Sequence, residues 1–189
     1  MSTTTFIILF VVAIVVIVAG SIVIYFTRKD RGFIERGNAL LRWPKINVPL
    51  MVVVDPSVYS WADTFEKACA FWNNATGMTL FLFNGELEDA ESFAGRSPGV
   101  VPVLAGSSEG NPHTKLTSEA DGTMMSAPIY VRPHEAWSKR YKIAVHELGH
   151  ALGLAHDDIP KSVMFPMLGD PTEVYATESD RKVLREWYG

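Results

Sequence analysis

Residues 146 to 156 read His-Glu-Leu-Gly-His-Ala-Leu-Gly-Leu-Ala-His, and this stretch limits the possible folds more than any other part of the chain. On a helix, His146 and His150 project from the same face about one turn apart, so both imidazoles can reach one metal ion. Gly153 can adopt a positive φ and end the helix, which returns His156 as a third ligand. Three protein ligands with an open fourth position are typical of a catalytic zinc site.

Glu147 follows the first of these histidines directly. Its carboxylate can stay out of the inner coordination shell and take a proton from a metal-bound water molecule that attacks a carbonyl carbon. The sequence therefore predicts that His146, His150 and His156 bind zinc and that Glu147 acts as a general base.

An apolar run from Phe6 to Phe26 is interrupted only by Gly20 and Ser21. At 1.5 Å per residue a helix of this length spans the roughly 30 Å core of a bilayer. A cleaved signal peptide is the first alternative, but it would begin with basic residues and have a shorter apolar run. A buried core helix is the second, but the rest of the chain is too short to enclose it. We therefore predict a single transmembrane anchor within residues 1–27.

The side of the membrane that carries the remaining residues is predicted from charge. The positive-inside rule weakly favours a cytoplasmic domain, because the basic residues that flank the span all follow it: Arg28, Lys29, Arg31, Arg36 and Arg42. The single cysteine, Cys69, excludes an intramolecular disulfide and gives no argument for an oxidising compartment. The net charge of -4 does not suggest a nucleic-acid-binding protein.

Residues 28–44 are basic, contain Gly32 and Gly37 and lack an apolar period, which predicts a juxtamembrane linker. Residues 45–189 are predicted to form one globular domain. Short apolar runs in it predict strands within residues 47–55, 79–83, 100–105 and 127–132. The acidic cluster of Glu86, Glu88, Asp89 and Glu91 is predicted to be a solvated surface, with a calcium site as the alternative.

Three helices are expected in this domain. The first follows Asp55-Pro56, has apolar residues at helical spacing from Val58 to Ala75, begins at Ser57 or Ser60 and ends at Gly77. Cys69 lies within it as a buried thiol. The second, residues 136–152, carries the histidine motif and an apolar stripe that includes Trp137, Tyr141, Val145, Leu148 and Leu152. The third begins at a capping-box pair, Thr177 and Asp180.

The stretch from His146 to His156 resembles the extended zinc signature of the metzincin metallopeptidases, and its filler residues are most similar to the matrixin branch. Phe71-Trp72-Asn73, Thr76-Gly77 and Glu135-Ala136-Trp137 resemble other matrixin segments. Ser162-Val163-Met164-Phe165-Pro166 is similar to the Met-turn of the family. The resemblance covers roughly residues 47–189.

The resemblance implies a metzincin-like zincin fold of the α+β class, with a mixed twisted sheet, two long helices and a C-terminal helix. It implies a zinc endopeptidase that acts on protein or peptide substrates, with Met164 as a hydrophobic floor beneath the metal. An isolated methionine would otherwise be an ordinary core residue. The sequence departs from the family at the structural zinc site, since only His113 and His134 lie in that region, and both are predicted at the surface. One zinc is therefore expected, and calcium is left open because no specific motif supports it.

Two other functions compete with a membrane-anchored endopeptidase. In the first, zinc only stabilises a membrane-anchored binding module, which would require a fourth protein ligand such as His113, His134 or Asp157. In the second, the protein is a membrane scaffold that binds no metal. Asp157 follows the third histidine and either ties its loop to the core or faces solvent.

Overall fold

The computed structural model describes residues 34–36, 39–85, 89–95, 97–166 and 175–189. The predicted anchor at Phe6 to Phe26 and the acidic residues Glu86 and Glu88 lie outside these ranges, so both predictions stay open. No helix within the described ranges is long and apolar enough to cross a membrane.

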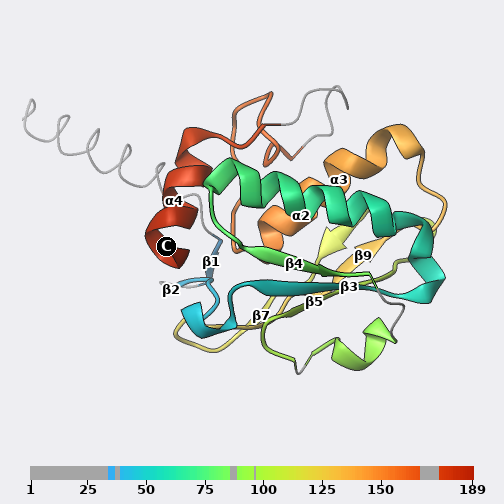
Figure 1. The fold of residues 1–189 in the computed structure, drawn as a ribbon, viewed down its shortest axis with the longest axis horizontal. Helices are drawn as coiled ribbons and strands as arrows, with labels where there is room; N and C mark the ends of the chain where they lie inside the picture. Colours follow the sequence, from blue (N-terminus) through green and yellow to red (C-terminus); the bar gives the residue numbers. More distant parts are fainter. Residues whose placement is uncertain (1–33, 37–38, 86–88, 96, 167–174) are drawn as a thin grey trace, which may run out of the picture. The chain divides into compact units, whose positions relative to one another are not determined.

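A five-stranded sheet forms the centre of the described domain, in the order β4-β3-β5-β9-β6 (Figure 1). The three pairings from β4 to β9 are parallel, and β6 is antiparallel to β9 at one edge. The strands are β3 (Leu50–Val54), β4 (Phe81–Asn84), β5 (Val100–Ala105), β6 (His113–Thr114) and β9 (Ile129–Val131). The mixed sheet and the α+β class predicted from the sequence are confirmed.

Helices and a short turn of helix cover the two faces of this sheet. The helices α2 (Ala62–Thr76) and α3 (Trp137–Ala151) lie together on one face (Figure 1). On the other face η3 (Ala90–Phe93) packs through Ala90 against Val53 and Leu104. Because both faces are covered, β3 and β5 are continuous apolar runs rather than alternating ones.

The first predicted helix is divided in the structure. A 3₁₀ segment, η2 (Pro56–Trp61), precedes α2, and Val58 within it has a non-helical φ of -124°. Asp55 caps this segment by accepting hydrogen bonds from the N–H and the hydroxyl of Ser57, so the prediction that a serine forms the cap is wrong. Gly77 ends α2 in the left-handed conformation as predicted, and Cys69 is buried.

The other two helices agree with the prediction except at one residue. Trp137 is 70% exposed and stacks on the guanidinium of Arg140, whereas the sequence placed it in the buried stripe. It is the first residue of α3. The helix α4 (Glu178–Tyr188) begins with the predicted capping box of Thr177 and Asp180.

Part of the predicted linker at residues 28–44 packs into the domain instead. Leu41 and Trp43 are buried, and the Trp43 indole donates a hydrogen bond of 2.7 Å to the Ala151 carbonyl. A two-stranded hairpin, β1 (Glu35–Arg36) and β2 (Ala39–Leu40), precedes them. The segment lacks an apolar period because it contributes single side chains to the core rather than one face of a long element.

The remaining described elements are short. They are η1 (Lys45–Asn47) and a second hairpin of β7 (Thr117–Ser118) and β8 (Met124–Ser126). Arg42 and Thr123 form a bridge that joins the amino-terminal segment to this second hairpin.

Candidate active site

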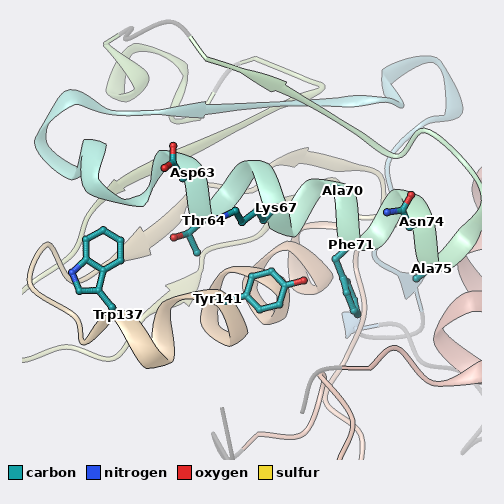
Figure 2. A pocket seen from close by; sticks show the side chains of 9 residues that line it. All are labelled: Asp63, Thr64, Lys67, Ala70, Phe71, Asn74, Ala75, Trp137 and Tyr141. Atoms are coloured by element: carbon teal, nitrogen blue, oxygen red, sulfur yellow. The ribbon is translucent and has the colours of Figure 1, made fainter. Parts of the chain in front are cut away.

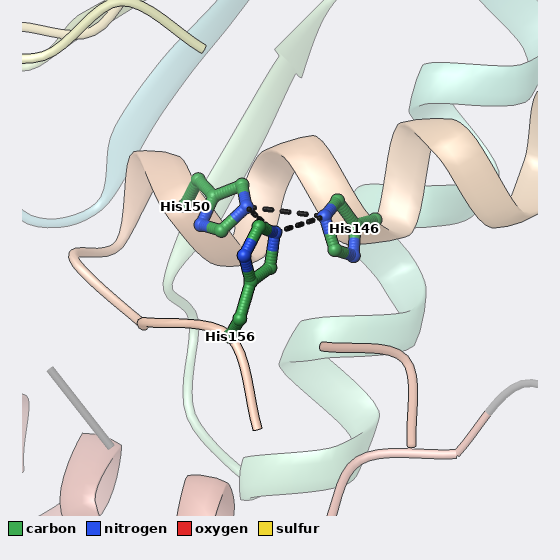
Figure 3. A group of neighbouring side chains, drawn as sticks. All are labelled: His146, His150 and His156. Atoms are coloured by element: carbon green, nitrogen blue, oxygen red, sulfur yellow. Dashed lines mark hydrogen bonds between the residues drawn. The ribbon is translucent and has the colours of Figure 1, made fainter. Parts of the chain in front are cut away.

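The structure brings the imidazoles of His146, His150 and His156 together at the C-terminal half of α3 (Figure 3). Their Nε2 atoms lie 3.1 Å apart for the pairs that include His150 and 3.2 Å apart for His146 and His156. The histidine cluster therefore presents three ring nitrogens to one common point.

The turn after α3 delivers the third histidine. Gly153 has a φ of 91°, its N–H donates to the His150 carbonyl, and the N–H of Leu154 donates to the Gly149 carbonyl. These two bonds form a Schellman motif, which reverses the chain after a helix. A residue with a β-carbon is disfavoured at this φ, so the glycine is what allows His156 to return to the helix face.

The opposite ring nitrogens fix how the first two imidazoles are oriented. Nδ1 of His146 lies 2.6 Å from the Val163 carbonyl oxygen, and Nδ1 of His150 lies 2.8 Å from the Leu154 carbonyl oxygen. A carbonyl only accepts hydrogen bonds, so each Nδ1 carries the proton and each Nε2 has a free lone pair. This arrangement holds the tautomer that a metal-binding histidine requires.

The cluster also favours neutral imidazoles. Burial lowers the pKa of His146, and burial followed by the nearby His146 lowers the pKa of His150 to about 3. Nitrogens that only accept cannot bond to one another, so a cation between them is the group that satisfies all three. The Nε2 atoms lie ~1.8 Å from the centre of their triangle, and this spacing would suit one zinc ion at the usual Zn–N distance of about 2.0–2.1 Å.

Glu147 is buried beside the histidine cluster, with 5% of its surface exposed. Burial raises the pKa of its carboxyl group to about 7, and a hydrogen bond from Thr114 opposes this rise. The Thr114 hydroxyl lies 2.7 Å from Oε2 of Glu147 and 3.0 Å from its backbone carbonyl oxygen. A carboxyl group with a pKa near neutrality can both accept and release a proton at physiological pH.

Met164 packs against the turn of α3 that separates the first two histidines. A β-carbon on Gly149 would overlap Sδ of Met164 and would lie 3.0 Å from the Trp72 ring. The Met164 carbonyl accepts a hydrogen bond from the N–H of Asp157, and the Met164 N–H donates to the Ser162 hydroxyl. The turn around Met164 therefore supports the helix, the third histidine's loop and, through Val163, the first histidine.

The other sequence candidates lie outside the histidine cluster. His113 is exposed and stacks on Tyr130, and His134 is exposed. Oδ1 of Asp157 accepts from the N–H of Ile159, while Oδ2 is buried without a hydrogen-bond partner, so this side chain points into its own loop. Across the ranges that the structure describes, no fourth histidine, cysteine or carboxylate joins the three histidines.

A cleft of about 590 Å³ opens in front of the histidine cluster and Glu147. One side is formed by residues 111–114, which precede and include the edge strand β6, and the other by α3 and the turn at Phe165 and Pro166. The cleft therefore lies between the edge of the sheet and α3, the helix that carries His146 and His150.

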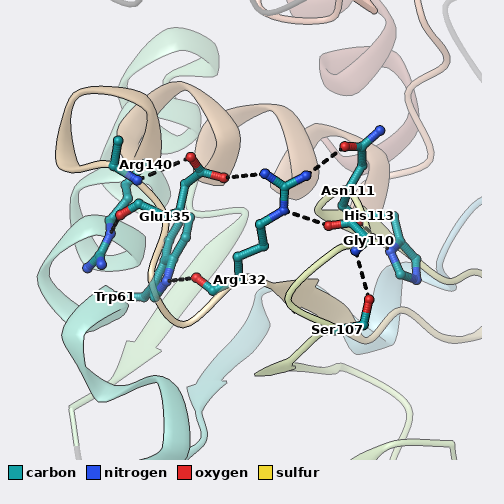
Figure 4. Close-up of polar contacts among 9 residues, drawn as sticks. Trp61, Ser107, Gly110, Asn111, His113, Arg132, Glu135 and Arg140 are labelled. Carbon is teal, nitrogen blue, oxygen red and sulfur yellow. Dashed lines mark hydrogen bonds and ion pairs between the residues drawn. The ribbon is translucent and has the colours of Figure 1, made fainter.

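Arg132 holds the strand side of this cleft in place (Figure 4). Its Nε donates to the Gly110 carbonyl at 2.7 Å, one terminal nitrogen donates to the Asn111 side chain, and the other pairs with Glu135. Sequence reasoning found neither Arg132 nor Thr114. Neither residue belongs to a spaced motif, and only the fold brings them to the cleft.

A larger cavity, of about 910 Å³, lies between α2 and the first half of α3 (Figure 2). Phe71, Trp137 and Tyr141 line it together with Asp63 and Lys67. None of the three histidines lines this cavity, and neither does Glu147. The smaller cleft is the better candidate for the active site, because convergent polar groups with shifted pKa values, those of His146, Glu147 and His150, lie there.

Comparison with known proteins agrees with this geometry. Residues 58–189 match the family described as Matrixin. The chain is 44% identical over 63 residues to macrophage metalloelastase of Oryctolagus cuniculus, which covers 29% of this chain and 14% of that protein. It is 28% identical over 134 residues to stromelysin-1 of Equus caballus, with 66% and 27% covered.

Matrilysin of Homo sapiens is 30% identical over 90 residues, with 43% of this chain and 34% of that protein covered. The matched stretches thus span well under two thirds of these relatives. The family match, in contrast, covers more than half of this chain and includes α2, α3, the histidine cluster and α4. On that basis the chain belongs to the matrixin family of peptidases.

Proposed function

We propose that this protein is a membrane-anchored zinc endopeptidase in which His146, His150 and His156 bind the metal and Glu147 is the general base. The observation that carries the proposal is the convergence of three unprotonated Nε2 atoms beside a buried carboxyl group in an open cleft. Membership of the matrixin family supports the same chemistry.

The residues present fit one zinc ion, since the three nitrogens are neutral, oriented by backbone carbonyls and correctly spaced. Zinc bound there would supply a Lewis acid that polarises the peptide carbonyl and lowers the pKa of a water molecule. Calcium binding stays a prediction without an identified site, because the described residues offer no second cluster of possible metal ligands.

Glu147 supplies the proton chemistry. Its carboxylate takes a proton from the attacking water, which forms the new C–O bond, and then delivers that proton to the amine as the C–N bond breaks. The raised pKa suits both transfers, because a weak acid near pH 7 loses its proton about as readily as it gains one.

The cleft favours an extended polypeptide as substrate. β6 is the last strand of the described sheet, and it lines the cleft beside Glu147. A peptide can add to a free strand edge through main-chain hydrogen bonds, which bind many sequences with little dependence on side chains. A protein or peptide laid along β6 would place one of its carbonyl groups near the histidine cluster.

The alternative, a binding module that zinc merely stabilises, is less well supported. Structural zinc sites usually have four protein ligands, and the described residues bring only three together. The three candidates for a fourth ligand have other surroundings. His113 stacks on Tyr130, His134 is exposed, and Asp157 accepts a hydrogen bond within its own loop.

The membrane part of the proposal rests on the apolar run from Phe6 to Phe26. The basic residues that follow the run weakly favour a cytoplasmic catalytic domain. Labelling of a carboxy-terminal tag from each side of sealed vesicles would identify the side of the membrane on which the catalytic domain lies. Release of the protein from membranes by alkaline carbonate without detergent would contradict the anchor.

The activity is tested with the full chain in detergent micelles. Casein and a peptide library are incubated with the wild type, with the wild type plus a zinc chelator, and with the variants Glu147→Ala and His134→Ala. We expect cleavage by the wild type and by His134→Ala, the matched control, and loss of cleavage in the other two cases. Equal activity in all four cases would refute the assignment.

A further inference from the structure

Thr114 connects the edge strand of the sheet to Glu147. Its backbone is fixed by pairing with Ile129 of β9, and the next N–H, that of Lys115, donates to the Pro128 carbonyl. From this position the side chain reaches across to α3, where Oγ1 lies 2.7 Å from Oε2 of Glu147 and 3.0 Å from its carbonyl oxygen. The hydroxyl thus lies between two oxygens of the same residue.

The contact leaves one carboxyl oxygen of Glu147 for the cleft. Thr114 occupies Oε2, and no other side chain in the described ranges bonds to either carboxyl oxygen. Because Glu147 lines the cleft, Oε1 is the oxygen available to a molecule bound there. A rotation of the carboxyl group that moved Oε1 away would break the bond to Thr114.

A hydroxyl has one proton to donate and two lone pairs to accept with, so Thr114 cannot donate to both oxygens at once. The shorter contact, to Oε2, fixes the carboxyl group. The longer contact, to the backbone carbonyl oxygen, keeps the Thr114 side chain against α3. Thr114 is therefore held close to both the side chain and the backbone of Glu147.

We infer that Thr114 is the positioning residue of Glu147, holding its carboxyl group in the orientation that leaves Oε1 for a substrate in the cleft. This inference rests on the proposed function. Burial makes the role necessary, since a buried carboxyl oxygen without a hydrogen-bond partner is destabilised by desolvation and the group would turn toward another partner.

The test compares Thr114→Val, which removes the hydroxyl and keeps the shape, with Thr114→Ser, which keeps the hydroxyl. Thr117→Val is the matched control, because Thr117 is an exposed strand threonine in β7. For each full-length protein we would measure kcat and KM on a cleaved peptide, the bound zinc per chain and the melting temperature. Thr114→Ala removes the same hydroxyl and replaces Thr114→Val if that variant does not fold.

We expect kcat to fall about tenfold in Thr114→Val, with KM and zinc content close to those of the wild type and a melting temperature lower by a few degrees. Thr114→Ser should recover most of kcat, and Thr117→Val should match the wild type. A wild-type kcat in Thr114→Val would overturn the inference, as would a Thr114→Ser variant that is equally impaired or a change confined to KM. A wild type that binds zinc but cleaves nothing would instead overturn the proposed function, and this inference with it.

Discussion

The indole nitrogen of Trp43 donates a hydrogen bond of 2.7 Å to the carbonyl oxygen of Ala151, the last residue of α3. The next two carbonyls are also satisfied from distant parts of the chain, that of Leu152 by the Tyr188 hydroxyl and that of Gly153 by the N–H of Ile34. The end of a helix leaves carbonyls without intrahelical partners. Here the amino-terminal segment and α4 supply those partners immediately before the third histidine.

Trp43→Ala should therefore destabilise the domain although Trp43 lies in the segment predicted to be a linker. Loss of a buried tryptophan typically costs about 3–5 kcal/mol of unfolding free energy. Ile46→Ala, at a residue 90% exposed, is the control and should change that free energy by less than about 0.5 kcal/mol. Urea denaturation of both variants measures the difference, and equal midpoints would show that the segment does not stabilise the fold.

Zinc should stabilise the folded protein through the histidine cluster. A ligand at about 100 times its Kd adds about 2.7 kcal/mol, which corresponds to a rise in melting temperature of about 5–10 °C for a domain of this size. His150→Ala should lose this rise, whereas His134→Ala should keep it because His134 is exposed and outside the cluster. Thermal scans with chelator and with added zinc provide the measurement, and an unchanged melting temperature in the wild type would contradict the site.

Gly149→Ala should destabilise the protein because the added methyl group would overlap Sδ of Met164 and approach the Trp72 ring. Overpacking of this kind costs about 1–3 kcal/mol. Gly85→Ala is a matched control, since its nearest neighbour would be a ring carbon of Phe83 at an ordinary 3.9 Å. Denaturant unfolding of the two variants should separate them, and similar unfolding free energies would mean that Met164 moves aside without cost.

Cys69 should be inert in the folded protein. Burial raises the pKa of its thiol from 9.0 to about 12, so the unfolded chain loses the proton at lower pH than the folded protein. Between pH 9 and about pH 12 the unfolded chain therefore binds fewer protons than the folded protein. In this range the free energy of unfolding falls as pH rises. Cys69→Ala should flatten this fall by about 1 kcal/mol per pH unit. Some slope should remain, because burial also raises the pKa of Tyr188 to about 12.

The corresponding measurements are unfolding curves from pH 9 to 11 and the rate of thiol labelling. Labelling of the wild type should be slow in buffer and fast in denaturant. Rapid labelling of the native protein, or parallel pH slopes for the wild type and Cys69→Ala, would show that the thiol is accessible.

The histidine spacing predicted the centre of the site because the relevant geometry is local. His146 and His150 lie four positions apart on a helix, and a glycine at 153 permits the reversal that returns His156. The buried strands β3 and β5 and the capping box of α4 were predictable for the same reason, since each depends on neighbours within a few residues.

Contacts between distant segments were not predictable. Nothing in the sequence around Thr114 indicates that its hydroxyl meets a carboxyl group 33 positions later, or that Arg132 binds the loop at Gly110. The same limit explains the errors. Trp43 was assigned to a linker and Trp137 to a buried stripe because exposure depends on which elements the fold places nearby.

The Schellman turn at Gly153 has a consequence for the length of the chain. Five residues lie between His150 and His156. The two hydrogen bonds of the turn, from Gly153 to His150 and from Leu154 to Gly149, fix the path of the first four of them. Insertion of one residue would rotate the last imidazole away from its companions, and deletion of one would leave it short of them. Unlike most surface connections, this one tolerates neither insertion nor deletion, so a protein with the same three ligands needs five residues between the last two histidines and a glycine at the third of them.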